Sequence, residues 1–266
     1  EKLRPAKSFL NPEVPYHFLH EKEPDASGQL QRVNTIFLTG KECAFKCLMC
    51  DLWKNTLDNT TPRGAILKQL DHALAMLPEG DTIKLYNSSN FFDPKAVLPE
   101  DYPGIIERIK SYKKVSVENH PKLCGDACVG FSRLLNGKLE IAMGLETIHP
   151  DVLPLLNKQM TIEDFAGAAS YLRSQNIDVR AFVLLNPPYL TDRAGNIKWA
   201  INTVKFAFKS GAQCCSIIPV RSGNGVMELL QQEQNYVAPS LDMLEEVFET
   251  SLSLKKGLVF ADTWDI

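Results

Sequence analysis

Short apolar runs alternate with stretches of helical periodicity from residue 35 to the end of the chain. The apolar runs are rich in β-branched residues, as in strands that are buried on both faces of a parallel sheet. The helical stretches repeat their apolar residues at intervals of three and four positions. This pattern predicts strands at 35–39, 82–86, 114–118, 139–143, 179–185, 214–219 and 258–261, and helices at 64–76, 161–174, 192–209 and 241–252. A repeat of strand and helix is typical of an α/β fold.

The repeat also predicts how the chain is divided. About six βα units favour a partial, open (β/α)6-type TIM barrel, formed as one domain by residues 34–266. Residues 1–33 contain prolines among charged residues without a sustained period, which predicts an irregular N-terminal arm lying across that domain. A parallel barrel carries its chemistry at the carboxyl ends of its strands. The residues that follow each predicted strand are therefore the first candidates for a site.

Three cysteines follow the first predicted strand. Cys43, Cys47 and Cys50 have the spacing C-x3-C-x2-C. Three thiolates in one loop can hold three irons of a [4Fe–4S] cluster and leave the fourth iron open, which is the arrangement of a catalytic metal site. The alternatives are a zinc site, which needs a fourth ligand, and three unrelated loop thiols.

Composition and charge limit which partners and which cellular location fit this chain. The net charge of −3 does not favour nucleic acid as a partner, although it does not exclude a large RNA. No apolar run approaches the roughly 18 residues that a membrane span needs, and we expect no membrane partner. The first residues lack the apolar segment of a signal peptide. Seven cysteines without such a signal predict a reducing, cytoplasmic location.

The cysteine spacing resembles the signature of the radical S-adenosylmethionine (SAM) superfamily. This resemblance implies that the three cysteines hold a [4Fe–4S] cluster whose open iron binds SAM. It further implies that an electron from a flavodoxin- or ferredoxin-type donor cleaves SAM to a 5′-deoxyadenosyl radical, which takes hydrogen from a substrate. The family fold is the partial TIM barrel that the strand and helix pattern predicts.

The strand ends resemble the SAM-binding positions of the subgroup that includes coproporphyrinogen oxidase and the Elongator catalytic subunit. Asn87, Ser88 and Ser89 stand where the family often has Gly-Gly-Glu, which implies that they hold the SAM ammonium; a polar turn is the alternative. Glu118 would face the methionyl or ribose groups, unless it forms a salt bridge with a neighbouring loop. Glu146 corresponds to the residue that contacts the ribose hydroxyls.

Four further residues are candidates for SAM binding, two from the resemblance (Lys158 and Val220) and two from their places on or after the predicted strand 179–185 (Arg180 and Asn186). Lys158 stands where the family has an arginine that pairs with the SAM carboxylate, although a lysine lacks the bidentate fork. Arg180 would pair with the SAM carboxylate or with Glu118, or else would extend outward over a helix. Asn186 is a candidate ribose contact, and Val220 lies where family members pack adenine against the backbone.

Longer segments, 85–93, 118–121, 144–147 and 221–225, resemble the group containing the radical SAM subunit of archaeosine synthase, which implies a modified nucleobase in tRNA as substrate. Met49 departs from the family, where many members have an aromatic residue. A small metabolite, a peptide substrate and a non-catalytic metal-binding scaffold are the alternatives. The other cysteines, predicted to be buried free thiols rather than ligands of an auxiliary cluster, are Cys124, Cys128, Cys214 and Cys215.

Overall fold

The computed structural model describes residues 2–264 and 266; Glu1 and Asp265, near the ends of the predicted arm and domain, lie outside the described residues. One mixed sheet has its strands in chain order, and within the described residues β1 and β8 are its two edges, so the barrel is open. β1 pairs antiparallel with β2, and β2 to β8 are parallel. The strands are β1 (His17–Pro24), β2 (Leu30–Phe37), β3 (Thr82–Tyr86), β4 (Lys114–Glu118), β5 (Lys138–Glu146), β6 (Asp178–Leu185), β7 (Cys214–Pro219) and β8 (Leu258–Ala261).

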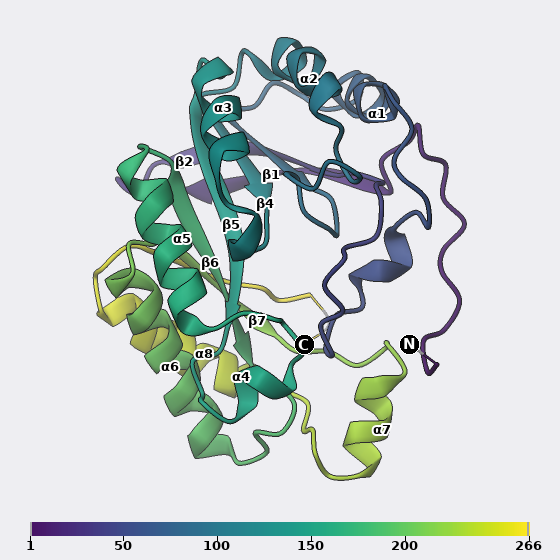
Figure 1. Cartoon of the computed structure of the whole chain (residues 1–266). Helices are drawn as coiled ribbons and strands as arrows, with labels where there is room; N and C mark the ends of the chain where they lie inside the picture. The colour runs from purple at the N-terminus through teal and green to yellow at the C-terminus, as the bar shows by residue number, and fades with distance from the viewer. Residues whose placement is uncertain (1, 265) are drawn as a thin grey trace.

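Most of the helices cover the outer face of this sheet, and the short ones that directly follow β5 and β7 lie beyond the carboxyl ends of the strands (Figure 1). They are α1 (Ala65–Leu74), α2 (Tyr102–Ile109), α3 (Asp126–Leu134), α4 (Val152–Leu155), α5 (Ile162–Ser174), α6 (Arg193–Lys209), α7 (Val226–Gln232) and α8 (Leu241–Ser253). Thr161 caps the start of α5 with a capping box, in which its side chain and that of Asp164 bond to each other's backbone N–H groups. The partial open barrel and the α/β class are confirmed.

Alternate residues of each strand face opposite sides of the sheet. On β3, Ile83 and Leu85 belong to the main hydrophobic core under the helices, and Val115 and Val117 continue it on β4. The intervening residues face the concave inner side. The hydrophobic core therefore lies between the sheet and the helices, and the inner surface of the sheet can carry polar and aromatic groups.

Buried or partly buried charged residues lie on the inner surface near the amino ends of the strands, and we call this group of Arg180, Glu140, Lys84 and Glu23 the ionic floor. Arg180 bonds to Glu140 at 3.1 Å and to the Ser216 hydroxyl at 3.3 Å. Lys84 forms an ion pair with Glu23 of β1. Burying these charges is tolerable because each has a partner of opposite sign.

Aromatic side chains form the next layer of the inner surface. The ring centroids of Phe37 and Tyr86 are 6.4 Å apart, and those of Tyr86 and Phe182 are 6.2 Å apart in an edge-on arrangement. Phe260 lies under the guanidinium of Arg180 at 5.0 Å. These four aromatic residues are partly exposed, so they line the concave side without filling it.

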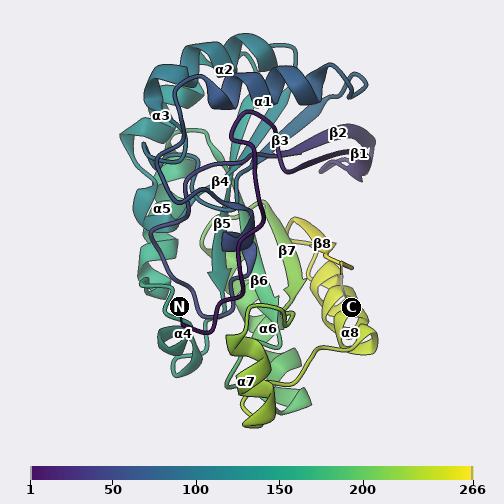
Figure 2. The ribbon, with the colours of Figure 1, turned by 90° about the vertical axis from the view of Figure 1, so that its right-hand side faces the viewer.

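The prediction of an irregular arm over residues 1–33 is wrong for its second half. Residues 17–24 form β1, whose charged side chains conceal the alternation that marks an apolar strand. The rest of the arm does lie across the domain, where it runs beside the cysteine loop (Figure 2). Glu42 of that loop binds Arg4 at 2.8 Å and Lys7 at 2.7 Å.

Candidate active site

The cysteine loop leaves the carboxyl end of β2. Cys43, Cys47 and Cys50 are free thiols, and burial raises the pKa of Cys47 to about 11 and that of Cys50 to about 12. In the described part of the chain, no three His, Cys, Asp or Glu side chains are grouped closely enough for a single metal ion. A cubane cluster does not need such convergence, because each cysteine binds a different iron. The donor set therefore fits a cluster better than zinc.

Contacts from distant segments hold this loop. The N–H of Leu48 donates to the carbonyl of Leu156 at 2.9 Å, and the amide of Asn157 donates to the carbonyl of Lys46 at 2.7 Å. The amide of Asn224 donates to the carbonyls of Leu48 and Cys50 at 2.8 and 3.2 Å. The sequence analysis included Asn224 in the segment 221–225 but assigned it no role, whereas its side chain clamps the loop.

Several predicted SAM-binding residues have unsatisfied polar atoms. Both side-chain polar atoms of Asn87, the hydroxyl of Ser89 and the side-chain oxygen of Asn186 are buried without a hydrogen-bond partner. All three residues follow β3 or β6 at the carboxyl edge of the sheet. Two other such atoms lie elsewhere, on α6 and α8. Buried polar groups normally have partners, so unsatisfied ones at a predicted site fit a polar ligand.

The same edge contains unusual backbone conformations. Ser88, Glu146 and Asn186 have φ angles of 52°, 67° and 56°, in the left-handed region that residues with a Cβ rarely adopt. Each follows or ends a different strand of the sheet. Such strain is retained at functional sites when the surrounding structure enforces it.

Glu146 and Lys158 are brought together as a buried ion pair. Their charged atoms are 2.5 Å apart. Burial disfavours the charged form of Lys158 and so lowers its pKa. The electrostatic attraction of Glu146, Cys47 and Cys43 is stronger than this effect, so the pKa of Lys158 is raised. A side chain at Gly144 would collide with both members of the pair. Gly144 therefore keeps open the space in which the pair forms.

Glu118 ends β4 close to this pair. Burial raises its pKa to about 7, although the backbone N–H groups of Asn87 and Ser88 and the charge of Lys158 favour the carboxylate. The N–H of Asn87 donates to the carboxylate at 3.1 Å. Glu118 thus contacts the loop after β3 rather than forming a salt bridge there.

Arg180 is not part of this group. It lies near the amino end of β6 in the ionic floor, where it pairs with Glu140. Burial opposes the charge of Glu140, but the charges of Arg180 and Lys114 outweigh burial and lower the pKa of Glu140 to about 2. It extends neither toward Glu118 nor outward over a helix. The strand pattern located Arg180 on β6 but could not tell which end of the barrel would hold its partner.

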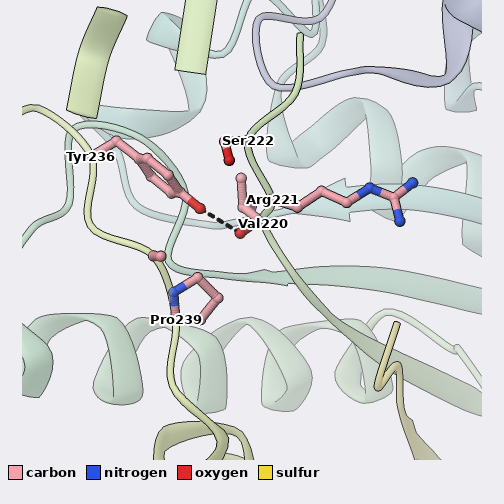
Figure 3. A pocket seen from close by; sticks show the side chains of 6 residues that line it. Val220, Arg221, Ser222, Tyr236 and Pro239 are labelled. Atoms are coloured by element: carbon pink, nitrogen blue, oxygen red, sulfur yellow. Dashed lines mark hydrogen bonds between the residues drawn. The ribbon is translucent and has the colours of Figure 1, made fainter. Parts of the chain in front are cut away.

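Val220 borders a pocket of about 260 Å³ (Figure 3), lined by Val220, Arg221, Ser222, Tyr236, Ala238 and Pro239. The hydroxyl of Tyr236 donates to the carbonyl of Val220 at 2.6 Å. The pocket lies at the carboxyl end of β7, next to the segment that clamps the cysteine loop. Sequence reasoning missed Tyr236, because an aromatic residue in a loop has no pattern to mark it.

Two other residues missed by sequence reasoning touch the cysteine loop. The ring of His120 stacks on Phe45, with centroids 3.6 Å apart and planes 9° apart. The amide of Asn90 donates to the sulfur of Cys43 at 3.1 Å. Both follow predicted strands and lie in the segments 85–93 and 118–121 that carry the family resemblance, but neither signal assigned a role to the individual residue.

Known proteins match this chain at low sequence identity. No protein-family model matches the chain. An uncharacterised protein of Methanocaldococcus jannaschii is 24% identical over 86% of this chain and 67% of its own length. Archaeosine synthase subunit beta of Methanosarcina acetivorans is 28% identical over 55% of this chain and 45% of its own length.

Solved structures match over a larger part of the chain. Coproporphyrinogen III oxidase from Escherichia coli, a radical SAM enzyme, matches with a TM-score of 0.57 at 10% identity, over 84% of this chain and 52% of its own. Elp3 of Methanocaldococcus infernus has a TM-score of 0.57 at 14% identity, over 76% of this chain and 52% of its own. This is the radical SAM fold.

A third solved structure is described with S-adenosylmethionine bound. SuiB of Streptococcus suis, bound to S-adenosylmethionine, matches with a TM-score of 0.57 at 13% identity, over 84% of this chain and 48% of its own. The chain spans about half the length of these solved structures.

Proposed function

We propose that this chain is a radical SAM enzyme. Cys43, Cys47 and Cys50 would hold a [4Fe–4S] cluster, and SAM would lie across the neighbouring strand ends. The observation that carries this proposal is the coincidence of three free thiols in one loop with the unsatisfied polar atoms of Asn87 and Asn186 at the same edge of the sheet. When reduced, the bound cluster supplies one electron that cleaves SAM to methionine and a 5′-deoxyadenosyl radical.

The task of the protein is to position SAM and to exclude water. Asn87 and Ser89 have the free donors and acceptors that an amino acid moiety needs. The Lys158 ammonium is paired with Glu146, so the two together offer one cation and one acceptor for the polar groups of SAM. Glu118, with a pKa of about 7, can accept or donate a hydrogen bond near neutral pH. Asn186 and Val220 would contact the nucleoside.

For the substrate we propose a nucleobase in tRNA. The inner surface supports this, because the partly exposed rings of Phe37, Tyr86, Phe182 and Phe260 offer faces on which a planar base can stack. The similarity to archaeosine synthase subunit beta points the same way. The runner-up is a free metabolite or a peptide, which the net charge of −3 favours.

The electron would come from an acidic, flavodoxin- or ferredoxin-type protein. A hollow of about 200 Å³ beside Cys43 is lined by Lys41, Lys46 and Lys95 together with Glu42 and Asp93. The lysines give this surface a positive balance that suits an acidic donor. All seven cysteines are free, which suits a reducing compartment such as the cytoplasm.

Anaerobic reconstitution tests the cofactor proposal. We expect about four irons and four sulfides per chain, and formation of 5′-deoxyadenosine after addition of dithionite and SAM. Cys47→Ala should lose the cluster, whereas Cys124→Ala should keep it, because Cys124 lies outside the loop. A colourless protein with tightly bound zinc would instead support the metal-binding scaffold.

Binding at varied salt tests the substrate proposal. With unmodified tRNA as the probe, we expect affinity to fall steeply as salt rises, because phosphate contacts release counterions. A flat dependence, with 5′-deoxyadenosine formation that tRNA does not accelerate, would favour a small substrate. Tyr86→Leu should weaken tRNA binding if a base stacks on the inner surface, while the exposed Tyr189→Leu serves as the matched control.

A further inference from the structure

Asn90 lies between the cysteine loop and the end of β4. It is buried, with 3% of its surface exposed. Its side-chain oxygen accepts the backbone N–H of His120 at 2.7 Å, and its side-chain nitrogen lies 3.1 Å from the sulfur of Cys43. A backbone N–H can only donate, so the oxygen must face His120. The NH₂ group must then face Cys43, and the amide can have only this orientation.

His120 is itself held in place on every side. Its ring stacks on Phe45 of the cysteine loop. One ring nitrogen accepts the N–H of Lys122 at 3.2 Å, so in the neutral ring the other nitrogen carries the proton and donates to the carbonyl of Lys158 at 3.0 Å. This fixes the backbone N–H that orients Asn90. The amide is therefore preorganised before any ligand arrives.

We propose that Asn90 sets the reduction potential of the cluster by donating an N–H···S hydrogen bond to the Cys43 thiolate. The inference rests on the proposed cluster at Cys43, Cys47 and Cys50. Reduction adds one electron to the cluster and increases the negative charge on its sulfurs, so the hydrogen bond stabilises the reduced state more than the oxidised one. Hydrogen bonds to sulfur are among the factors that set cluster potentials.

Asn90 is a suitable place to test such an effect. Backbone N–H groups, which no side-chain substitution removes, bond to Cys47 and Cys50. At Cys43 a backbone contact from Phe45 is joined by the side-chain donor of Asn90. Substitution of Asn90 therefore removes one hydrogen bond to one ligand and leaves the three cysteines intact.

Asn119 provides a matched control. It is also 3% exposed and accepts a backbone N–H, that of Phe92, at 3.2 Å. Its NH₂ group lies 3.4 Å from the sulfur of Cys124, which is outside the predicted cluster. Asn119→Leu therefore makes a comparable change to a buried asparagine without touching a cluster ligand.

The test is an anaerobic redox titration of the reconstituted protein, followed by electron paramagnetic resonance of the reduced cluster. In Asn90→Leu we expect the ratio of reduced to oxidised cluster at a given potential to fall about tenfold, a shift of about 59 mV to more negative potential. Asn119→Leu should leave the ratio unchanged. Asn90→Asp keeps the acceptor for the His120 N–H but loses the donor, so it should shift the ratio in the same direction.

The outcomes separate this inference from the proposed function. Failure of the parent protein to assemble a cluster would overturn the proposed function. A parent with a full complement of iron, and Asn90 variants with iron and potential unchanged, would overturn the tuning role alone. Loss of the cluster from both Asn90 variants in a folded chain would also overturn it, because Asn90 would then be needed for assembly rather than for the potential.

Discussion

Replacing Glu118 by glutamine should change how stability depends on pH. Glu118 lies at the carboxyl end of β4, where burial raises its pKa from 4.5 to about 7. An acid whose pKa is higher in the folded state binds more protons there than in the unfolded state between these two values. Stability must then fall as pH rises through this window. Below about pH 4.5 both states are protonated and the penalty is absent.

The size of the effect follows from the pKa difference. One pKa unit corresponds to about 1.36 kcal/mol, so the carboxylate of Glu118 destabilises the folded chain by about 3 kcal/mol well above pH 7. Glutamine has no charge to desolvate, and its oxygen can still accept the N–H of Asn87. Relative to the parent, Glu118→Gln should therefore gain stability as pH rises from about 4.5 to 7.

Urea unfolding of the metal-free protein at several pH values measures this difference. Glu245→Gln, on the exposed face of α8, is the control and should stay within about 0.5 kcal/mol of the parent throughout. If the difference between Glu118→Gln and the parent does not change between pH 4.5 and 7.5, burial does not control this carboxyl group and the reasoning is refuted.

Two further substitutions test the packing of the site. Lys158→Met should lower the free energy of unfolding in urea by about 3–5 kcal/mol, because it leaves the buried Glu146 carboxylate unpaired. Adding Glu146→Gln to this variant should recover most of that loss. A double variant whose loss equals the sum of the losses of the two single variants would contradict this. Asn224→Ala should cost about 1–3 kcal/mol and speed alkylation of Cys50 in the metal-free chain, because the loop loses its clamp. An unchanged alkylation rate would show that the loop is held by its other contacts.

Much of the fold could be predicted because its strands are apolar and are bounded by turn residues. The predicted bounds of β3, β4, β7 and β8 match those observed. The short helices α2 and α3 were not predicted, because prolines and glycines interrupt their periodicity. β1 was not predicted either, because inward side chains such as Glu23 are charged. Glu23 forms an ion pair with Lys84, so β1 lacks the apolar residues that mark a strand in the sequence.

Many residues of the site could be predicted from the sequence, but not which of them contact one another. The cysteine spacing is local and can be read directly. The pairing of Glu146 with Lys158 depends on a left-handed backbone at Glu146 and on the open space at Gly144, neither of which sequence spacing reveals. Arg180 was expected to pair with the SAM carboxylate or with Glu118, or to extend outward over a helix, but its partner Glu140 lies on the neighbouring strand near the amino ends of the strands. Tertiary packing decides such partners.

The clamp by Asn224 has a consequence for how the protein is made. Its amide reaches the carbonyl of Leu48, 176 residues earlier in the chain. A ribosome adds about 5–20 residues per second, so the thiol loop emerges roughly 10–35 s before its clamp exists. During that interval the three cysteines are exposed to oxidants and to stray metals. The proposed cluster should therefore assemble only after Asn224 has been translated, and a nascent chain that stops before Asn224 should bind iron poorly.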